Sequence, residues 1–530
     1  MPDAVVIGAG PNGLVAANRL ADAGWSVVVL EAADEPGGAV KSSELIEPGF
    51  VTDHFSAFYP LAAASPALHA LELERWGLRF RRGPLVLAHP ATDGTCVVVS
   101  RDLDETAASL DSFAPGDGDA WRSLMALWAR VRDPLLRGMV TPMPPVRVAA
   151  ELTARLGPRG MLRLTRLGLL PVRRFAQEHF RGAGGARLLA GNALHADLTV
   201  DSALGGFFGF LLCALAQDVG YPFPEGGAGG LSRALVRRAE ARGVAVVTGA
   251  PVTRIVVRRG AAVGVGLADG TEIDARRAVL AAVDAPTLYL RLIPREHVPP
   301  AVLNDIRSFD RDWGTVKADW TLDGPIPWAH PDARRAPVVH VADTVDALSV
   351  HTSELFRGRV PERPFLVFGQ YSMGDPTRAP AGKETAWAYT HVPLGTAIDE
   401  DVFVRRMEDE VERLAPGFRA LVRRRHVFTP RELESANPSL VGGSINGGTA
   451  QLHQQFVFRP TPGLGRPETP VARLYLASSS AHPGGGVHGG PGAIAARAAL
   501  TAWRARTATL AVGGLAVAVG ARRCARGRRR

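Results

Sequence analysis

Short apolar runs alternate with one amphipathic stretch at the start of the chain. Residues 3–7 and 26–30 read as buried strands, and residues 14–23 between them read as a helix, which predicts a βαβ unit. Further on, alternating apolar residues interrupted by Arg259-Gly260 and Asp269-Gly270 predict a β-meander. The hydrophobic pattern therefore predicts an α/β fold.

Two long regions with other patterns separate the apolar runs. The first is rich in helix, with helices expected at residues 121–131, 175–189 and 206–216. The second mixes strands with one amphipathic helix, and we expect them at residues 315–320, 364–371, 385–391 and 401–414. The stretch 206–216 is apolar on all sides, which is more typical of a core helix than of a substrate tunnel.

Composition and charge narrow the class of protein. The chain has 530 residues, 46% of them apolar, and a net charge of +9, which fits a globular protein with more than one sizeable core. Six of the arginines lie in the last nine residues, namely Arg522, Arg523, Arg526, Arg528, Arg529 and Arg530. The rest of the chain is nearly balanced, so we expect no nucleic acid partner.

The cysteines and the first residues of the chain indicate the cellular compartment that we expect for the protein. Cys96, Cys213 and Cys524 are far apart, so they form no redox pair, metal motif or disulfide framework, and a reducing compartment is expected. The first apolar run lacks the charged flank of a secretory signal and reads as a strand. We therefore expect a cytoplasmic protein.

The glycine-rich turn after the first strand is the strongest local motif. Its residues are Gly8, Ala9, Gly10, Pro11, Asn12 and Gly13. The three glycines permit the tight turn, the approach of a pyrophosphate and close packing of helix on strand, while the helix N-terminus favours phosphate charge. Glu31 ends the second strand, where its carboxylate can bind both ribose hydroxyls and disfavours the 2′-phosphate of NADP. The turn predicts a dinucleotide site.

Several segments carry a resemblance to a known family. Gly37-Gly38 follow Glu31, and Pro48 to Asp53 read PGFxxD; a second glycine cluster precedes a helix at 232–242, and residues 482–487 read HPGGGV. Together these segments resemble flavin amine oxidases, phytoene-desaturase-type enzymes and the proteins called pyridine nucleotide-disulfide oxidoreductase domain-containing protein 2. The resemblance implies FAD, held in part by Gly37, Gly38 and Val252, the last meeting the adenine from an expected strand at 246–255.

The C-terminal glycines take their meaning from the same resemblance. Pro483, Gly484, Gly485, Gly486 and Val487 would let the backbone pass against the flavin ring. A strand at 474–477 precedes them, and a helix at 492–504 would point its positive end at the flavin. His482 would touch the flavin edge or make a structural hydrogen bond, and both roles stay open.

Lys317 is one of only three lysines among 61 basic residues. The stretch from Trp313 to Lys317 resembles the Gly-x-x-x-Lys strand of monoamine oxidases, whose lysine reaches the flavin through a water. This implies a catalytic role in oxygen reduction or in positioning the hydride donor; a lysine in solvent or in a salt bridge is the other interpretation. His54 is a weaker candidate of the same kind. Histidines such as His195, His340 and His351 have no partner spacing, and we expect no metal site.

These observations predict a domain organisation. A Rossmann-like, discontinuous FAD-binding domain takes residues 1–75, 215–290 and 441–506, and an α+β substrate domain takes residues 76–214 and 291–440. The apolar-then-basic tail, 507–530, is too short in its apolar part to span a bilayer. It is either a peripheral contact with an anionic membrane surface or a low-complexity extension.

The predicted function is that of an FAD-dependent oxidoreductase. By resemblance, its substrate is a small apolar or isoprenoid-like molecule that loses a hydride, as in desaturases and dehydrogenases. A flavin amine oxidase is the second interpretation. A flavin-binding regulatory protein with little turnover is the third.

Overall fold

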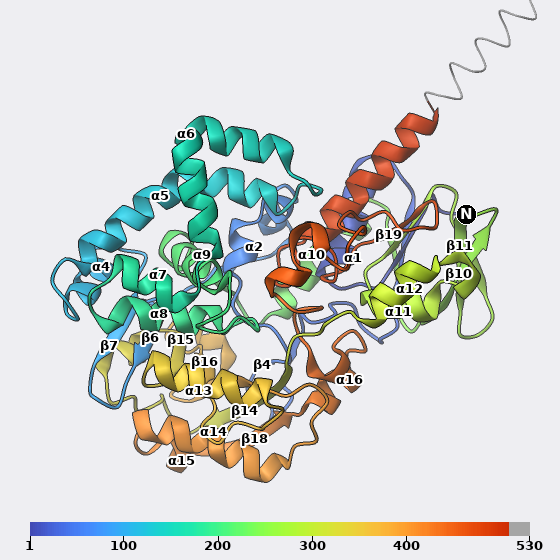
Figure 1. Cartoon of the computed structure of the whole chain (residues 1–530). Helices are drawn as coiled ribbons and strands as arrows, with labels where there is room; N and C mark the ends of the chain where they lie inside the picture. Colours follow the sequence, from blue (N-terminus) through green and yellow to red (C-terminus); the bar gives the residue numbers. More distant parts are fainter. Residues whose placement is uncertain (508–530) are drawn as a thin grey trace, which may run out of the picture.

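Residues 1–507 are described by the computed structural model of the chain, and residues 508–530, including most of the predicted tail, lie outside the described part. Two large sheets organise the molecule. Figure 1 shows helices α4 to α9 gathered on one side and the N-terminal parallel sheet with β10 and β11 on the other. No helix of residues 1–507 is long and apolar enough to cross a membrane.

The first sheet is the predicted dinucleotide-binding sheet. Its five strands run in the order β19-β13-β1-β2-β9, and every neighbouring pair is parallel. The strands are β1 (Ala4–Ile7), β2 (Val27–Leu30), β9 (Ala245–Val247), β13 (Ala278–Ala281) and β19 (Leu474–Leu476). The helices against it are α1 (Pro11–Asp22), α10 (Gly229–Ala241) and the C-terminal helix at 490–507. Strands from distant parts of the chain thus build one α/β unit.

Beside the parallel sheet lies the predicted β-meander. It consists of β10 (Val252–Arg258), β11 (Ala261–Leu267) and β12 (Glu272–Asp274), paired antiparallel. The single strand predicted at 246–255 was wrong, because β9 and β10 belong to different sheets. The chain bends between them at Gly249, whose φ is +60°, and the amide of Ala250 donates to the carbonyl oxygen of Glu31.

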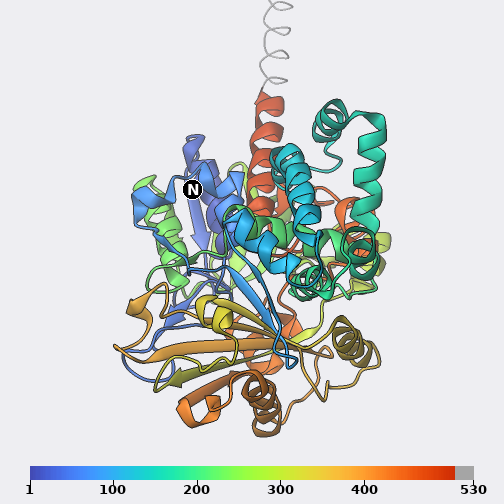
Figure 2. The ribbon, with the colours of Figure 1, turned by 90° about the vertical axis from the view of Figure 1, so that its left-hand side faces the viewer.

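The second sheet has seven strands in the order β18-β14-β17-β16-β15-β6-β7. They are β6 (Leu87–Pro90), β7 (Cys96–Val99), β14 (Gly314–Leu322), β15 (Val338–Val341), β16 (Leu366–Gln370), β17 (Glu384–Val392) and β18 (Val422–Phe428). Helices α13 (Val345–Phe356), α14 (Glu400–Leu414), α15 (Phe418–Leu421) and α16 (Pro430–Ala436) pack around it. Figure 2 shows this sheet crossing the lower half of the molecule, below the parallel sheet.

The central strand β14 has two chemically different faces. Val316, Ala318 and Trp320 pack into the apolar core that α14 covers. The alternate residues, Lys317 and Asp319 among them, are polar yet buried. Because side chains alternate across a strand, this polar row points to the opposite side of the sheet.

A set of helices covers the remaining side of the cavity described below. It comprises α4 (Leu103–Asp111), α5 (Asp117–Gly138), α6 (Val146–Leu169), α7 (Val172–His179), α8 (Ala183–Ala193) and α9 (Gly205–Asp218). The helix predicted at 175–189 was wrong as one element. Asp117 accepts hydrogen bonds from the amides of Arg181 and Gly182, at 2.8 and 2.9 Å, which stabilises the break between α7 and α8.

Short elements complete the chain. They are β3 (Ser42–Ser43), β4 (Thr52–Asp53), β5 (Phe80–Arg81), β8 (Phe223–Pro224), α2 (Pro60–Ala64), α3 (Pro66–His69), α11 (Ala285–Thr287) and α12 (Pro300–Arg307). All strands of the parallel sheet fall within residues 1–75, 215–290 and 441–506, and all strands of the seven-stranded sheet fall within 76–214 and 291–440. The exact domain boundaries stay a prediction.

Candidate cofactor and substrate site

The glycine-rich turn joins β1 to α1 as the sequence predicts. Gly8 has a φ of +93°, and a Cβ on Gly13 would lie 2.0 Å from the carbonyl oxygen of Gly8, so no side chain fits there. Gly10 is the N-cap of α1 and no side chain caps this helix end. The uncapped N-terminus leaves backbone N–H groups available to an anion.

The loop that contains Gly37 and Gly38 packs against this turn. The amide of Gly37 donates to the carbonyl oxygen of Ala9 at 3.0 Å. A Cβ on Gly38 would lie 2.9 Å from the Cα of Gly10, whereas a Cβ on Gly10 would meet nothing nearer than 3.8 Å. Gly10 therefore borders free space beside a tightly packed pair of loops, which fits the approach of a pyrophosphate.

Glu31 lies at the carboxyl end of β2, next to the turn. Its carboxylate accepts hydrogen bonds from the amide of Ala9 at 2.7 Å and from the amide of Ala33 at 3.0 Å. Val252 begins β10 two residues after Ala250, whose amide donates to the carbonyl oxygen of Glu31 at 2.8 Å. The predicted ribose and adenine contacts thus come from neighbouring segments.

A cavity of about 620 Å³ extends from α1 towards the helical side of the molecule. Eight of the predicted site residues line it: Pro11, Asn12, Lys317, His482, Pro483, Gly485, Gly486 and Val487. The side-chain oxygen of Asn12 is buried there without a hydrogen-bond partner. An unpaired buried acceptor in the wall fits a ligand that brings a donor.

The other predicted site residues do not line this cavity. They are Gly8, Ala9, Gly10, Gly13, Glu31, Gly37, Gly38, Val252 and Gly484. All but Gly484 belong to the turn, to the strand ends or to the loop of Gly37 and Gly38 just described. A Cβ on Gly484 would lie 3.3 Å from the guanidinium carbon of Arg459, so this glycine packs against protein.

The C-terminal glycines allow close backbone packing, and two of them, Gly485 and Gly486, also line the cavity. A Cβ on Gly485 would lie 2.8 Å from the carbonyl oxygen of Asn446, and one on Gly492 would lie 1.9 Å from that of Asn12. Gly489, with a φ of +67°, packs against Val15 of α1 in the same way. These contacts fix the start of the C-terminal helix against the start of α1.

His482 is buried and its Nε2 lies 3.3 Å from the carbonyl oxygen of Gly138, at the end of α5. A carbonyl only accepts, so the ring donates from Nε2. Burial lowers the pKa of His482 to about 4, which keeps the ring neutral near pH 7. The structural hydrogen bond that the sequence left open is therefore present.

Lys317 lies on the polar face of β14, at the cavity wall, and forms an ion pair with Asp319. The lysine is 3% exposed and the aspartate 0%, so the interpretation of Lys317 as a solvent lysine was wrong and the salt bridge is present. Burial raises the pKa of Asp319, although the Lys317 charge opposes this shift. The ammonium also lies 5.9 Å from the ring centres of Trp387 and Phe428.

His54 does not line the cavity, although its neighbour Phe55 does. Its Nε2 lies 2.7 Å from the hydroxyl oxygen of Ser43, and its ring centre lies 6.2 Å from that of Phe428. Burial is the main cause that lowers the pKa of His54, followed by the charge of Lys317. A direct chemical role for His54 has no support in this position.

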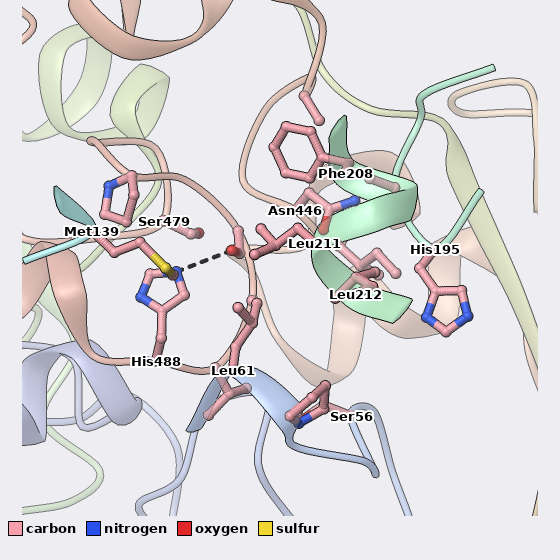
Figure 3. A pocket seen from close by; sticks show the side chains of 18 of the residues that line it. Ser56, Leu61, Met139, His195, Phe208, Leu211, Leu212, Asn446, Ser479 and His488 are labelled. Atoms are coloured by element: carbon pink, nitrogen blue, oxygen red, sulfur yellow. Dashed lines mark hydrogen bonds between the residues drawn. The ribbon is translucent and has the colours of Figure 1, made fainter. Parts of the chain in front are cut away.

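The wall on the helical side is apolar. It is formed by α5, α6 and α9 and includes Leu135, Leu136, Met139, Val148, Leu152, Phe207, Phe208, Leu211 and Leu212. Helix α9 was expected to be core, and its other side is, with Phe210, Cys213 and Leu215 buried. In Figure 3, Phe208, Leu211 and Leu212 project from this helix at the cavity. One helix thus serves as both core and cavity wall.

Arg459 is a functional candidate that the sequence analysis missed. It is fully buried, and its guanidinium donates to the carbonyl oxygens of Thr449, Asn446 and Ser479 at 2.8 to 3.0 Å. Burial lowers the pKa of this arginine to about 10. No motif marks it, because its partners are backbone oxygens 10 to 20 residues away, which carry no side-chain signature.

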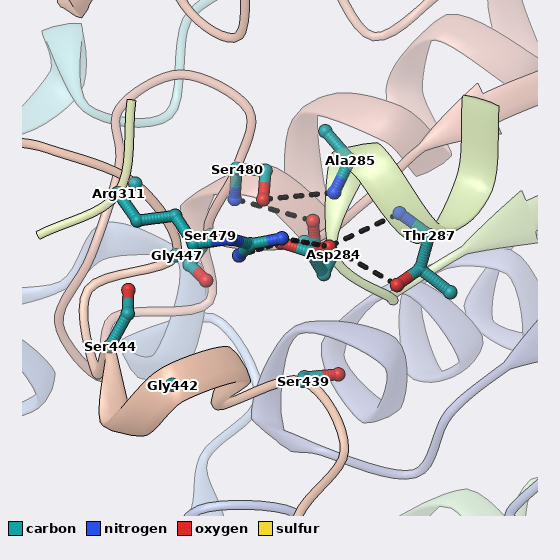
Figure 4. A network of polar contacts seen from close by, with 12 residues as sticks. Asp284, Ala285, Thr287, Arg311, Ser439, Gly442, Ser444, Gly447, Ser479 and Ser480 are labelled. Carbon is teal, nitrogen blue, oxygen red and sulfur yellow. Dashed lines mark hydrogen bonds and ion pairs between the residues drawn. The ribbon is translucent and has the colours of Figure 1, made fainter. Parts of the chain in front are cut away.

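The same loops are held by a second network, shown in Figure 4. Asp284, just after β13, pairs with Arg311 at 2.7 Å, and its carboxylate accepts from Thr287 at 3.1 Å. The amide of Ala285 donates to the hydroxyl of Ser480 at 3.1 Å. The network ties the end of the parallel sheet to the loop that leads into residues 482–487.

His195 and His340 form a contact that the sequence does not indicate. Their Nε2 atoms lie 2.8 Å apart, one residue following α8 and the other lying on β15. His195 lines the cavity. The sequence shows no spacing that marks this pair, because a contact between a loop and a strand 145 residues away leaves no local pattern. Among residues 1–507, no group of three or more acidic, histidine or cysteine side chains could hold a metal ion.

A glycine-rich turn on a parallel sheet, joined through one cavity to a second sheet, is the arrangement of a dinucleotide-binding protein with a small-molecule site. Residues 12–499 match the family of flavin containing amine oxidoreductases, and the chain belongs to that family. It is an FAD-dependent oxidoreductase acting on a small molecule.

Individual relatives agree with the family. The chain is 30% identical to pyridine nucleotide-disulfide oxidoreductase domain-containing protein 2 of Rattus norvegicus, covering 93% of this chain and 92% of that protein. It is 27% identical to the lycopene-forming phytoene desaturase of Pseudescherichia vulneris, covering 93% and 97%. An oxidoreductase from Methanosarcina mazei, 16% identical, shares the fold with a TM-score of 0.64 over 94% of this chain and 99% of its own.

Proposed function

We propose that the protein binds an apolar, isoprenoid-like molecule and removes a hydride from one of its carbons, as a desaturase does. The observation that carries this proposal is the cavity of about 620 Å³ whose helical wall is apolar and which reaches the segment 482–487. Burial of hydrocarbon against such a wall is favourable by roughly 25 cal/mol per Å². The similarity to phytoene desaturases supports the same substrate class.

We further propose which residues hold FAD. The turn from Gly8 to Gly13 would bind the pyrophosphate, Glu31 the ribose and Val252 the adenine. Gly37 and Gly38 would flank the extended cofactor, and the backbone from Pro483 to Val487 would lie along the flavin. FAD supplies the hydride acceptor when bound. The free space beside Gly10 and the unpaired oxygen of Asn12 support this arrangement.

Lys317 is proposed to stabilise negative charge that develops at the cavity. Its ammonium is held against Asp319 and borders the cavity, which supports a fixed position for the charge. His482 is proposed to position its loop, because its Nε2–H is engaged by Gly138. Its low pKa also argues against proton transfer near pH 7.

The charge of the cavity wall disfavours an amine substrate. Among the described residues that line the cavity there is no aspartate or glutamate. An amine carries a positive charge near pH 7, and this wall offers no carboxylate to pair with it. The amine oxidase interpretation is therefore the weaker of the two enzyme readings.

The test starts from the FAD-loaded full chain, mixed without oxygen with a panel of isoprenoid hydrocarbons and alcohols. Loss of the oxidised flavin absorbance with one member supports the proposal and names the substrate. If neither the panel nor any electron donor reduces the flavin, the regulatory interpretation gains and the proposed function fails.

The role of Lys317 is tested separately by reoxidation. The flavin is photoreduced without oxygen and mixed with air-saturated buffer in wild type, Lys317→Met and the control Lys383→Met, whose ion pair with Asp323 lies outside the cavity. Fast reoxidation that collapses only in Lys317→Met supports a role in oxygen chemistry. Equally slow reoxidation in all three points to another electron acceptor and removes that role.

A peripheral membrane contact through residues 508–530 is also proposed, from sequence alone, because an apolar run precedes six arginines. Deleting 508–530 should abolish co-sedimentation with anionic liposomes. Unchanged binding of the shortened chain would remove the idea.

A further inference from the structure

The contact between His195 and His340 constrains both rings. Two nitrogens 2.8 Å apart need one donor and one acceptor, so only one of the two Nε2 atoms carries a proton when both rings are neutral. Burial lowers the pKa of His195 to about 3 and also lowers that of His340 well below its usual value, so both rings are neutral near pH 7. Two proton arrangements therefore remain.

The surroundings of His340 decide between them. Its Nδ1 is buried without a partner, and a Cβ on Gly191 would lie 2.1 Å from that nitrogen, so the ring edge abuts Gly191. A proton on Nδ1 would be an unpaired buried N–H pressed against carbon, whereas a lone pair there faces only the Cα hydrogens. His340 therefore carries its proton on Nε2 and donates it to Nε2 of His195.

His195 then carries its proton on Nδ1. Among residues 1–507 this nitrogen has no hydrogen-bond partner, and the side chain lines the cavity. Two polar neighbours in the wall are already paired: the hydroxyl of Tyr221 donates to Asn192 at 2.5 Å, and that of Tyr389 points to the backbone oxygen of His195 at 3.4 Å. His195 thus keeps a free donor, and the buried hydroxyl of Thr315 is a second unpaired group of the same wall.

We propose that His195 Nδ1–H donates a hydrogen bond to an oxygen of the substrate, a carbonyl or a hydroxyl, so that the substrate is an oxygenated isoprenoid-like molecule rather than a pure hydrocarbon. Figure 3 places His195 on the far side of Leu211 and Leu212 from His488. The polar end of the substrate lies at His195, and its apolar body runs along α9 towards the segment 482–487. This inference rests on the proposed function, since it adds the polar end of the same substrate.

The Nδ1–H group of His195 is a neutral donor, as an apolar wall requires. A charged imidazolium would pay a large desolvation cost in this apolar wall, while a neutral N–H polarises a carbonyl at little cost. His340 acts as a positioning residue, because its proton fixes which nitrogen of His195 can donate. His89, with its ring centre 5.6 Å from that of His340, and His391 are buried and have lowered pKa values, so they add no charge to the pair near pH 7.

The first test reads the protons directly and needs no substrate. Histidine labelled with ¹⁵N in the FAD-loaded full chain gives the tautomer of each ring from long-range ¹H–¹⁵N correlations, with His195→Phe and His195→Asn to assign the signals. We expect His195 as the Nδ1–H form and His340 as the Nε2–H form. The reverse pair would overturn the inference, whatever the enzyme turns over.

The second test compares farnesal with farnesene, its hydrocarbon counterpart, by the shift each causes in the flavin absorbance spectrum. We expect farnesal to bind about tenfold more tightly, about 1.4 kcal/mol, and His195→Phe to remove that preference while farnesene binds as before. A preference that survives in His195→Phe, or none in wild type, overturns the inference. Phe208→Leu is the control and should weaken both ligands alike. Whether either ligand reduces the flavin tests the proposed function separately.

Discussion

Lys317 and Asp319 form an ion pair two residues apart on one strand, with both side chains buried on the face of β14 that borders the cavity. Neighbours at this spacing share a face of the sheet, so the strand itself brings the charges together. Burying two charges is costly unless each is paired. The pair therefore holds the lysine charge at the cavity and is vulnerable to loss of either partner.

Lys317→Met should lower the free energy of unfolding by about 3 kcal/mol, because Asp319 is left buried without its cation. Urea denaturation measures the change. Lys317→Met with Asp319→Asn should recover most of the loss, since the uncompensated carboxylate is gone. Lys383→Met, which removes an exposed pair, should cost less than about 1 kcal/mol. Equal losses in the two lysine variants would contradict the role of burial.

The glycine-rich turn predicts different outcomes for neighbouring glycines. Gly13→Ala should prevent folding, because its Cβ would lie 2.0 Å from the oxygen of Gly8. Gly10→Ala should fold within about 1 kcal/mol of wild type, since the nearest atom is 3.8 Å away. It should nevertheless bind FAD at least about tenfold more weakly, because the methyl group stands where the pyrophosphate is proposed to pass.

Fluorescence titration with FAD and urea denaturation separate these two effects. Gly168→Ala is the control, because a Cβ there meets nothing within 4 Å and the residue lies in helix α6. It should leave FAD affinity unchanged. Normal FAD binding by Gly10→Ala would refute the proposed path of the cofactor.

Arg459→Met should destabilise the protein by about 3 kcal/mol or more, because several buried carbonyl oxygens lose their donor at once. FAD affinity should fall with it, since these loops border the cavity. Arg459→Lys should recover only part of the lost stability and FAD affinity, because one ammonium group cannot reach all of the carbonyl oxygens. Arg466→Met, which removes an exposed pair with Glu468 at 3.6 Å, serves as the control and should be nearly neutral.

The buried histidines predict acid sensitivity. Burial lowers the pKa of His89 to about 3, well below the unfolded value of about 6.5. The unfolded chain therefore binds the proton first, and stability is retained above about pH 6.5 and lost as the pH falls towards 3. Between about pH 7 and pH 5, His89 alone should account for about 2 kcal/mol of lost stability.

His89→Gln should remove the part of the pH-dependent loss of stability that comes from His89. The glutamine keeps a donor for the carbonyl oxygen of Ala342, which lies 3.1 Å from Nε2 in the wild type. The urea midpoints of wild type and variant at about pH 7 and about pH 5 measure this difference in stability. His453→Gln, at an exposed histidine, is the control and should not remove the loss of stability that is assigned to His89. A His89→Gln variant with the full wild-type pH dependence would show that this ring is not the cause.

The sequence by itself determined the first βαβ unit, the glycine-rich turn and the dinucleotide type of the cofactor. These features are local, because a strand, a turn and a helix are encoded by residues that follow one another, as in the stretch from Ala4 to Leu30. It also determined β14 with Lys317 on it, since strand alternation is a short-range pattern. It failed where one predicted element contains a break, as near Gly182 in the helix predicted at 175–189 and at Gly249 in the strand predicted at 246–255.

Only the tertiary structure decided which polar groups meet. Arg459 pairs with carbonyls of separate loops, His195 pairs with His340 from the other side of the cavity wall, and Gly492 packs on Asn12 at the opposite end of the chain. Such contacts join residues up to hundreds of positions apart and leave no periodic trace, because long-range proximity depends on how the two sheets and the helices pack.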